Sequence, residues 1–138
     1  MPAPPIVQAG LVIPSRPEHL PEVRELVGST ADKAGFPPHE VQRIVTAAFE
    51  AVVNGATHGS PLGPQNTINV TVSVYADRMV VEVADQGPGF GNAKADEMPD
   101  LASARGRGIA LMRALVDEVE LVTDGGGKVI LTKYRRVE

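Results

Sequence analysis

The chain has 138 residues, of which 43% are hydrophobic and 22% are charged, and its formal net charge is −4. This length and composition are typical of one globular domain and argue against disorder or a coiled coil. Cysteine is absent, which excludes disulfides, cysteine-ligated metal sites and a thiol nucleophile. The acidic balance and the few aromatic residues (3 Phe, 2 Tyr, no Trp) make direct nucleic-acid binding a poor expectation.

The composition and the N-terminus also bear on location. No apolar run is long enough to span a membrane, so we expect no membrane partner. The segment Met1–Pro5 lacks the basic and apolar regions of a signal peptide. We therefore expect a cytoplasmic protein that folds as a single domain over residues 1–138, with residues 1–10 as a flexible, proline-rich lead.

The first elements are a strand and a helix. Leu11–Ile13 predicts a short strand. Ser15 and Glu18 have the spacing of a capping box, in which the serine is the N-cap of a helix and the glutamate reaches back to it. Apolar residues then recur at helical spacing, and Gly35 is the expected stop.

A second helix is predicted over about Glu40–His58. Its apolar residues form one arc at 100° per residue, whereas Arg43, Glu50 and Asn54 fall roughly opposite. The arc consists of Val41, Ile44, Val45, Ala48, Phe49 and Val52.

The second half of the chain predicts strands with one more helix. Ile68–Tyr75 alternates in polarity and Met79–Ala84 returns, which indicates an antiparallel hairpin. Asp85–Arg105 lacks any period and is expected to be a long loop, of the kind that is often functional. After it we expect a helix over about Gly108–Glu118 and a second hairpin, Val119–Thr123 with Lys128–Tyr134. The order predicts an α+β fold, a two-layer sandwich with helices on one face of a mostly antiparallel sheet.

Three places could carry chemistry, and the first is the pair Glu50 and Asn54. Residues four apart share a helix face, and Asn54-Gly55 lowers helix propensity. One interpretation is a solvated face near the helix end. The other is a carboxylate for proton transfer beside an amide oxygen that binds a hard cation.

The second and third places are glycine-rich. Asp85, directly after a strand, could accept from an amino group, with Gly87 and Gly89 leaving room for a ligand; a plain tight turn is the alternative. Gly106-Arg107-Gly108 opens the expected third helix, where free N–H groups and nearby arginines favour an anion, although a loop junction with chance arginines has the same pattern.

Taken together, these motifs resemble the GHKL ATPase superfamily, which includes gyrases, heat-shock chaperones, sensor histidine kinases and mismatch-repair ATPases. The short form of the chain resembles the bacterial anti-sigma-factor serine-protein kinase branch, and the fold that this implies is the Bergerat ATP-binding fold. The resemblance spans about Leu11–Arg135. The motifs that carry it are Glu50-Ala-Val-Val-Asn54-Gly-Ala-Thr-His58-Gly59, Asp85-x-Gly87-x-Gly89-Phe90, Gly106-x-Gly108 and Gly127-Lys-Val-Ile-Leu-Thr132-Lys133.

The resemblance implies the cofactors ATP and Mg²⁺ and a role for each motif residue. Asn54 would coordinate Mg²⁺, Glu50 would be the general base, and Asp85 would accept from the adenine amino group. Lys94–Arg105 would form a lid over the nucleotide. The other nucleotide contacts that it implies are Gly87, Gly89, Arg105, Gly106, Arg107, Gly108 and Thr132.

The function that this resemblance implies is an Mg·ATP-dependent serine/threonine kinase and anti-sigma factor. Such a protein binds a sigma factor and phosphorylates an anti-sigma antagonist on serine, and the family allows a homodimer. The alternative is an ATP-gated protein-binding module without significant kinase activity. A histidine-kinase catalytic part and a stand-alone ATPase are further options.

Overall fold

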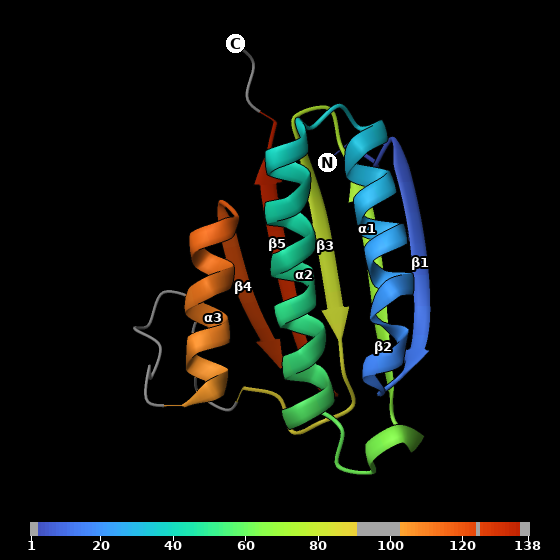
Figure 1. Cartoon of the computed structure of the whole chain (residues 1–138), viewed down its shortest axis with the longest axis vertical. Helices are drawn as coiled ribbons and strands as arrows, with labels where there is room; N and C mark the ends of the chain where they lie inside the picture. Colours follow the sequence, from blue (N-terminus) through green and yellow to red (C-terminus); the bar gives the residue numbers. More distant parts are fainter. Residues whose placement is uncertain (1–2, 91–102, 124, 136–138) are drawn as a thin grey trace.

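The computed structural model describes residues 3–90, 103–123 and 125–135. One five-stranded sheet forms a layer, and three α-helices cover one of its faces (Figure 1). The helices are α1 (Leu20–Lys33), α2 (Pro38–His58) and α3 (Ala104–Leu115), with short 3₁₀ turns at Pro17–His19 and Gly63–Gln65. The strands are β1 (Val7–Pro14), β2 (Thr67–Val74), β3 (Arg78–Ala84), β4 (Glu118–Thr123) and β5 (Gly127–Tyr134).

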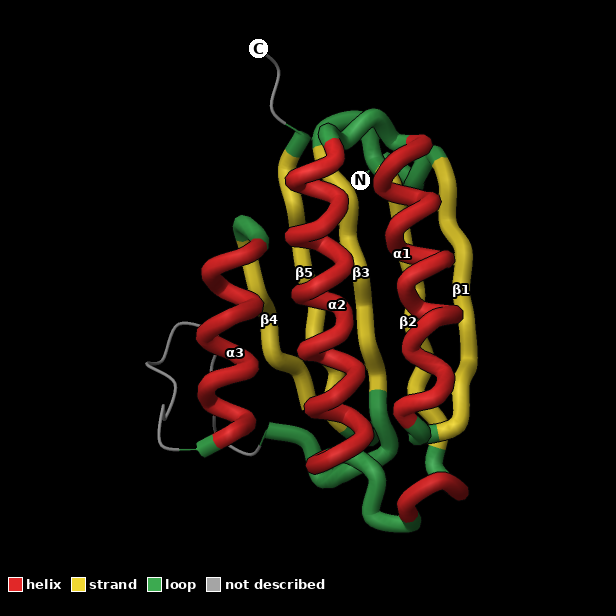
Figure 2. The backbone as a smooth tube through the Cα atoms, viewed as in Figure 1, coloured by secondary structure: helices red, strands yellow, loops and turns green. Residues whose placement is uncertain are grey.

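The sheet has the order β1-β2-β3-β5-β4, and every neighbouring pair is antiparallel. Figure 2 shows α1 and α2 side by side over the sheet and α3 beside α2 near β4. Both expected hairpins are present, as β2–β3 and β4–β5. The prediction of a two-layer α+β sandwich with helices on one face is therefore confirmed.

The core lies between the helices and the covered face of the sheet. Buried and less buried side chains alternate along β3 and β5 and over most of β2, and the buried set faces the helices. The arc expected on α2 is buried at four positions and partly buried at Val41 and Phe49. The four fully buried positions of this arc are Ile44, Val45, Ala48 and Val52.

Two expectations for the N-terminal part are wrong. Residues 7–10 are not a lead, because β1 begins at Val7 and pairs along its whole length with β2. Ser15 caps no helix: α1 begins only at Leu20, with His19 as N-cap, and the Ser15 hydroxyl instead contacts the Ser60 hydroxyl. The prolines at positions 17 and 21 favour helix starts after Ser15, so the capping-box spacing is coincidental.

The third helix also differs from expectation. It begins at Ala104, four residues before the predicted start, and Ser103 is its N-cap. The Ser103 hydroxyl accepts from the Gly106 N–H at 2.9 Å. The two glycines have low helix propensity and hide the first turn in the sequence, but the serine cap satisfies one of its exposed N–H groups.

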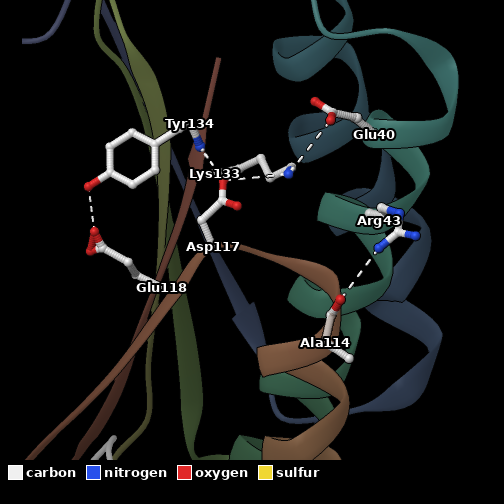
Figure 3. Close-up of polar contacts among 7 residues, drawn as sticks. All are labelled: Glu40, Arg43, Ala114, Asp117, Glu118, Lys133 and Tyr134. Atoms are coloured by element: carbon white, nitrogen blue, oxygen red, sulfur yellow. Dashed lines mark hydrogen bonds and ion pairs between the residues drawn. The ribbon is translucent and has the colours of Figure 1, made fainter. Parts of the chain in front are cut away.

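A buried ion cluster stabilises the N-terminal end of α2, which begins at Pro38 (Figure 3). Lys133 is 7% exposed, and its Nζ lies 3.5 Å from Asp117 Oδ2 and 3.6 Å from Glu40 Oε1. Asp117 also accepts the Tyr134 N–H at 2.7 Å. A buried ammonium paired with two carboxylates joins α2 to the β4–β5 hairpin, and it serves packing at the end of α2 opposite to Asn54.

In the described part of the chain, no helix combines the length and the apolar character that crossing a bilayer requires.

Candidate functional site

The polar residues Glu50 and Asn54 face α3. Helices α2 and α3 run antiparallel: at one end the Arg43 guanidinium donates to the Ala114 carbonyl at 3.4 Å (Figure 3), and at the other end Gly108 lies against Glu50 and Asn54. A Cβ at Gly108 would lie 3.2 Å from Glu50 Oε2 and 3.2 Å from Asn54 Nδ2. The glycine thus lets α3 approach this pair closely.

Burial decides between the two interpretations of this helix face. Asn54 is only 8% exposed and Glu50 is half-buried, so the interpretation of Glu50 and Asn54 as a solvated helix face is wrong. Gly55, which was one possible helix end, is buried within α2 and lies against Asp85, whose Cβ would be 3.4 Å from an added Cβ. Gly55 therefore brings Asn54 and Asp85 to the same end of the molecule.

The Asn54 amide is a suitable ligand for a hard cation. Its Nδ2 is buried and makes no hydrogen bond in the structure. The orientation of a side-chain amide is an assignment, so this position can equally be held by the amide oxygen, a ligand that Mg²⁺ accepts. Within the described residues no group of three His, Cys, Asp or Glu side chains could hold a metal ion. A site with one protein ligand fits Mg²⁺, which commonly takes its remaining ligands from water and substrate phosphates.

Asp85 follows β3 and is held by two backbone amides. Its Oδ1 accepts the N–H groups of Gly87 and Gly127, each at 2.9 Å. The Asp85 N–H in turn donates to the Gly127 carbonyl at 2.8 Å. With Oδ1 engaged in both bonds, the lone pairs of Oδ2 can accept from an amino group of a ligand.

Glycines surround the Asp85 carboxylate because no Cβ fits beside it. An added Cβ would lie 2.1 Å from Asp85 Cγ at Gly59, and 2.9 Å from Asp85 Oδ2 at Gly127. At Gly126 it would lie 2.2 Å from the Asp85 carbonyl oxygen. Gly59 and Gly126 were not predicted as site residues. Their only signal in the sequence is membership of the motif ending His58-Gly59 and of the Gly125–Gly127 run.

The glycines after Asp85 pack closely against other parts of the protein. An added Cβ at Gly87 would lie 2.4 Å from Gly59 Cα, and one at Gly89, whose φ is +81°, would lie 2.5 Å from Thr123 Cγ2. Their missing side chains therefore let the loop pack against the protein itself. A contact between this loop and a base stays a prediction.

Arg105 lies at the Asp85 loop. Its Nη2 donates to the Gly89 carbonyl at 3.2 Å, and its guanidinium carbon stands 4.3 Å from the centre of the Phe90 ring. Burial lowers the pKa of Arg105, and the nearby Asp85 carboxylate opposes this shift. The expected phosphate contact of Arg105 stays a prediction; in this structure the side chain joins the start of α3 to the loop.

The anion site expected at Gly106–Gly108 changes with the start of α3. The Gly106 N–H already bonds the Ser103 hydroxyl, and the Arg107 N–H bonds the Ser103 carbonyl at 3.1 Å. Gly108 is in the second turn, beyond the N–H groups that a helix start leaves free. Gly108 is better explained by its contact with Glu50 and Asn54, and Arg107 is exposed on the same turn. Of the expected lid, residues 94–102 lie outside the described residues.

Thr132 is not at this site. Asp85 meets the beginning of β5 at Gly127, whereas Thr132 is five residues further along, which is about 17 Å at the usual rise of a strand. Thr132 also points away from the face of Leu131, which is buried under the helices. Thr132 thus lies far along β5 from Asp85, and its contact with the nucleotide stays a prediction.

The geometry thus gathers a carboxylate, an orphaned amide and a second carboxylate at one end of the helical layer, and the comparisons identify the family. Residues 13–133 match the model of the histidine kinase-like ATPase domain. The chain belongs to this family. The histidine kinase-like ATPase domain therefore covers nearly the whole sequence, and the GHKL resemblance is confirmed.

Curated relatives of this ATPase domain carry the name serine-protein kinase RsbW. The protein from Bacillus velezensis is 30% identical over 131 residues, which cover 88% of this chain and 82% of the relative. The one from Listeria innocua is 29% identical over 133 residues, covering 90% of this chain and 85% of the relative. The anti-sigma-factor serine kinase branch is therefore supported at the level of the family.

Solved structures agree with the fold of the ATPase domain. The RsbU and RsbW domains of Rv1364c from Mycobacterium tuberculosis match with a TM-score of 0.69 and 18% identity, over 96% of this chain and 34% of that one. The catalytic domain of histidine kinase ThkA matches with a TM-score of 0.62 and 15% identity, over 94% of this chain and 99% of that one. These likenesses show the fold.

Proposed function

We propose that this ATPase domain is an Mg·ATP-dependent serine/threonine protein kinase and anti-sigma factor that acts in the cytoplasm. The single observation that carries the proposal is that Glu50 and the buried Asn54 both face Gly108 of α3, while the neighbouring Gly55 packs against Asp85. The names of the relatives, serine-protein kinases, support transfer of phosphate to serine.

The proposed nucleotide lies between Asp85 and the α2–α3 contact. Asp85 Oδ2 would accept from the adenine amino group, which selects adenine over bases that lack a donor there. The phosphates would then extend toward Asn54 and the N-terminal turns of α3, near Arg107. When bound at Asn54, Mg²⁺ would supply charge neutralisation of the phosphates.

Glu50 is the proposed general base. As the serine Oγ bonds to the γ-phosphorus, the bond from that phosphorus to the β-phosphate oxygen breaks and ADP leaves. The hydroxyl proton passes to the Glu50 carboxylate. Positioning and charge stabilisation dominate such transfers, and the protein supplies both through α2 and α3.

The proposed partners are a sigma factor, which the protein would sequester, and a small antagonist, which it would phosphorylate on serine. The experiment is to incubate the protein with Mg²⁺, ATP labelled on the γ-phosphate, and proteins that it captures from its native host. We expect label on serine in a small captured protein and no label when ATP is labelled on the α-phosphate instead. If the protein binds ATP but transfers no label, it is an ATP-gated binding module and the kinase assignment is wrong.

A further inference from the structure

A polar network outside the family motifs holds the loop between α2 and β2 to the Asp85 loop. Its centre is Asn66, which is 6% exposed. Asn66 Oδ1 accepts the Leu62 N–H at 2.6 Å, and its Nδ2 donates to Gln86 Oε1 at 2.9 Å. The Asn66 carbonyl also accepts the Ser15 N–H at 3.0 Å. A buried asparagine thus closes its own loop and reaches across to the neighbour of Asp85.

Gln86 receives more than this one bond. Its Oε1 also accepts the Thr67 N–H at 2.7 Å, and its own N–H donates to the Gly59 carbonyl at 3.2 Å. The residue itself is exposed, so packing does not fix its side chain. Its position depends on hydrogen bonds to the start of β2 and to the end of α2.

These bonds hold the far side of Asp85. On one side Asp85 is held through Gly87 and Gly127, and on the other side its neighbour Gln86 is tied to Asn66, Thr67 and Gly59. Asp85 is packed tightly against Gly59, since a Cβ added at Gly59 would lie 2.1 Å from Asp85 Cγ. A shift of the loop by about 1 Å would move Asp85 Oδ2 out of hydrogen-bond range of a bound base.

We propose that Asn66 and Gln86 are a positioning pair that sets the place of Asp85 and thereby the affinity and selectivity for adenine nucleotides. The inference rests on the proposed ATP site and adds to it two residues that touch no ligand. Its chemical content is one acceptor atom, Gln86 Oε1, which receives two donors. A side chain with the same reach and an acceptor should keep the function, and one without an acceptor should lose it.

The test compares two substitutions of Gln86, one matched control and one substitution of Asn66. Gln86→Met keeps the length and removes the acceptor, whereas Gln86→Glu keeps an oxygen for both donors. Gln65→Met is the matched control, because Gln65 is an exposed glutamine on the α2–β2 loop, and among the described residues its hydrogen bond is made by its backbone N–H rather than its side chain. As a second probe, Asn66→Asp keeps the acceptor for Leu62 but replaces the donor to Gln86 by a charged carboxylate oxygen.

Binding of Mg·ATP and Mg·GTP is measured by calorimetry, and the melting temperature without nucleotide is measured alongside. We expect Gln86→Met and Asn66→Asp to raise the Kd for ATP by about tenfold, as loss of one or two hydrogen bonds implies. We also expect a smaller ratio of the Kd for GTP to the Kd for ATP than in wild type. Gln86→Glu and Gln65→Met should bind as wild type does. Gln86→Met should lower the melting temperature without nucleotide by only a few degrees, because the buried Asn66 amide loses its acceptor.

The inference is overturned if Gln86→Met keeps the affinity and selectivity of wild type. It is also overturned if ATP and GTP weaken equally together with a large fall in melting temperature, since that result indicates a merely structural role. If wild type itself binds no ATP, the proposed function fails and the inference fails with it.

Discussion

Replacing Glu50 by glutamine should lower the rate of phosphoryl transfer by about 10²–10⁴-fold, the range that loss of a general base produces. The amide cannot take the hydroxyl proton, but it keeps the volume and polarity of the side chain beside Gly108. ATP affinity should therefore change little. The measurement is transfer of γ-phosphate to the captured antagonist in single-turnover conditions, with ATP binding measured in parallel.

The control for this experiment is Glu25→Gln, an exposed carboxylate on α1 away from the α2–α3 contact. It should transfer phosphate as wild type does. A Glu50→Gln protein that binds ATP and transfers phosphate at the wild-type rate would remove Glu50 from its role as base.

Replacing Gly59 by alanine should raise the Kd for ATP on the order of 100-fold. The new Cβ would lie 2.1 Å from Asp85 Cγ, so Asp85 must move, and a displacement of about 1 Å in such a contact costs on the order of 100-fold. Wild type at an ATP concentration of 100 times its Kd gains about 2.7 kcal/mol of stability, which a thermal shift reports directly. At the same ATP concentration the variant should gain only about 0.4 kcal/mol.

Gly28→Ala is the matched control for Gly59→Ala. Its Cβ would meet only Val45 Cγ2 at 3.6 Å, an ordinary contact within the helical layer, and alanine improves the helix by about 1 kcal/mol. This variant should melt no lower than wild type and keep the full shift with ATP. If Gly59→Ala also keeps the full thermal shift with ATP, Asp85 does not bind the nucleotide from its observed position.

The fold could be predicted where periodicity is clean. The α2 arc and the β2–β3 alternation each indicate both the element and its buried face, because side-chain direction follows directly from the period. The start of α3 could not be predicted, because Gly106 and Gly108 weaken the helical pattern. Its one sequence signal is Ser103, the N-cap residue. The β1 start was missed for a related reason, since pairing with β2 rather than local pattern extends the strand to Val7.

The site could be predicted in part, because motif spacing names residues without saying what surrounds them. Asn54 and Glu50 share a helix face by spacing alone, but that α3 covers this face follows only from the tertiary contact at Gly108. Thr132 is a second example: it was expected at the nucleotide from its motif, but it lies toward the opposite end of β5 from Gly127, which contacts Asp85. Glycines whose missing Cβ faces Asp85 likewise emerge only in three dimensions.

The most direct test of the account is calorimetric titration of Mg·ATP into wild type and into Asp85→Asn. Asparagine keeps the shape of the side chain, but its amide nitrogen cannot accept from the adenine amino group, and its single oxygen cannot replace both carboxylate oxygens. The account predicts a single saturable site in wild type. It predicts a Kd raised by at least about 100-fold in Asp85→Asn, because the charged hydrogen bond that orients the adenine amino group is lost. Equal binding by the two proteins, or no binding by wild type, would contradict it.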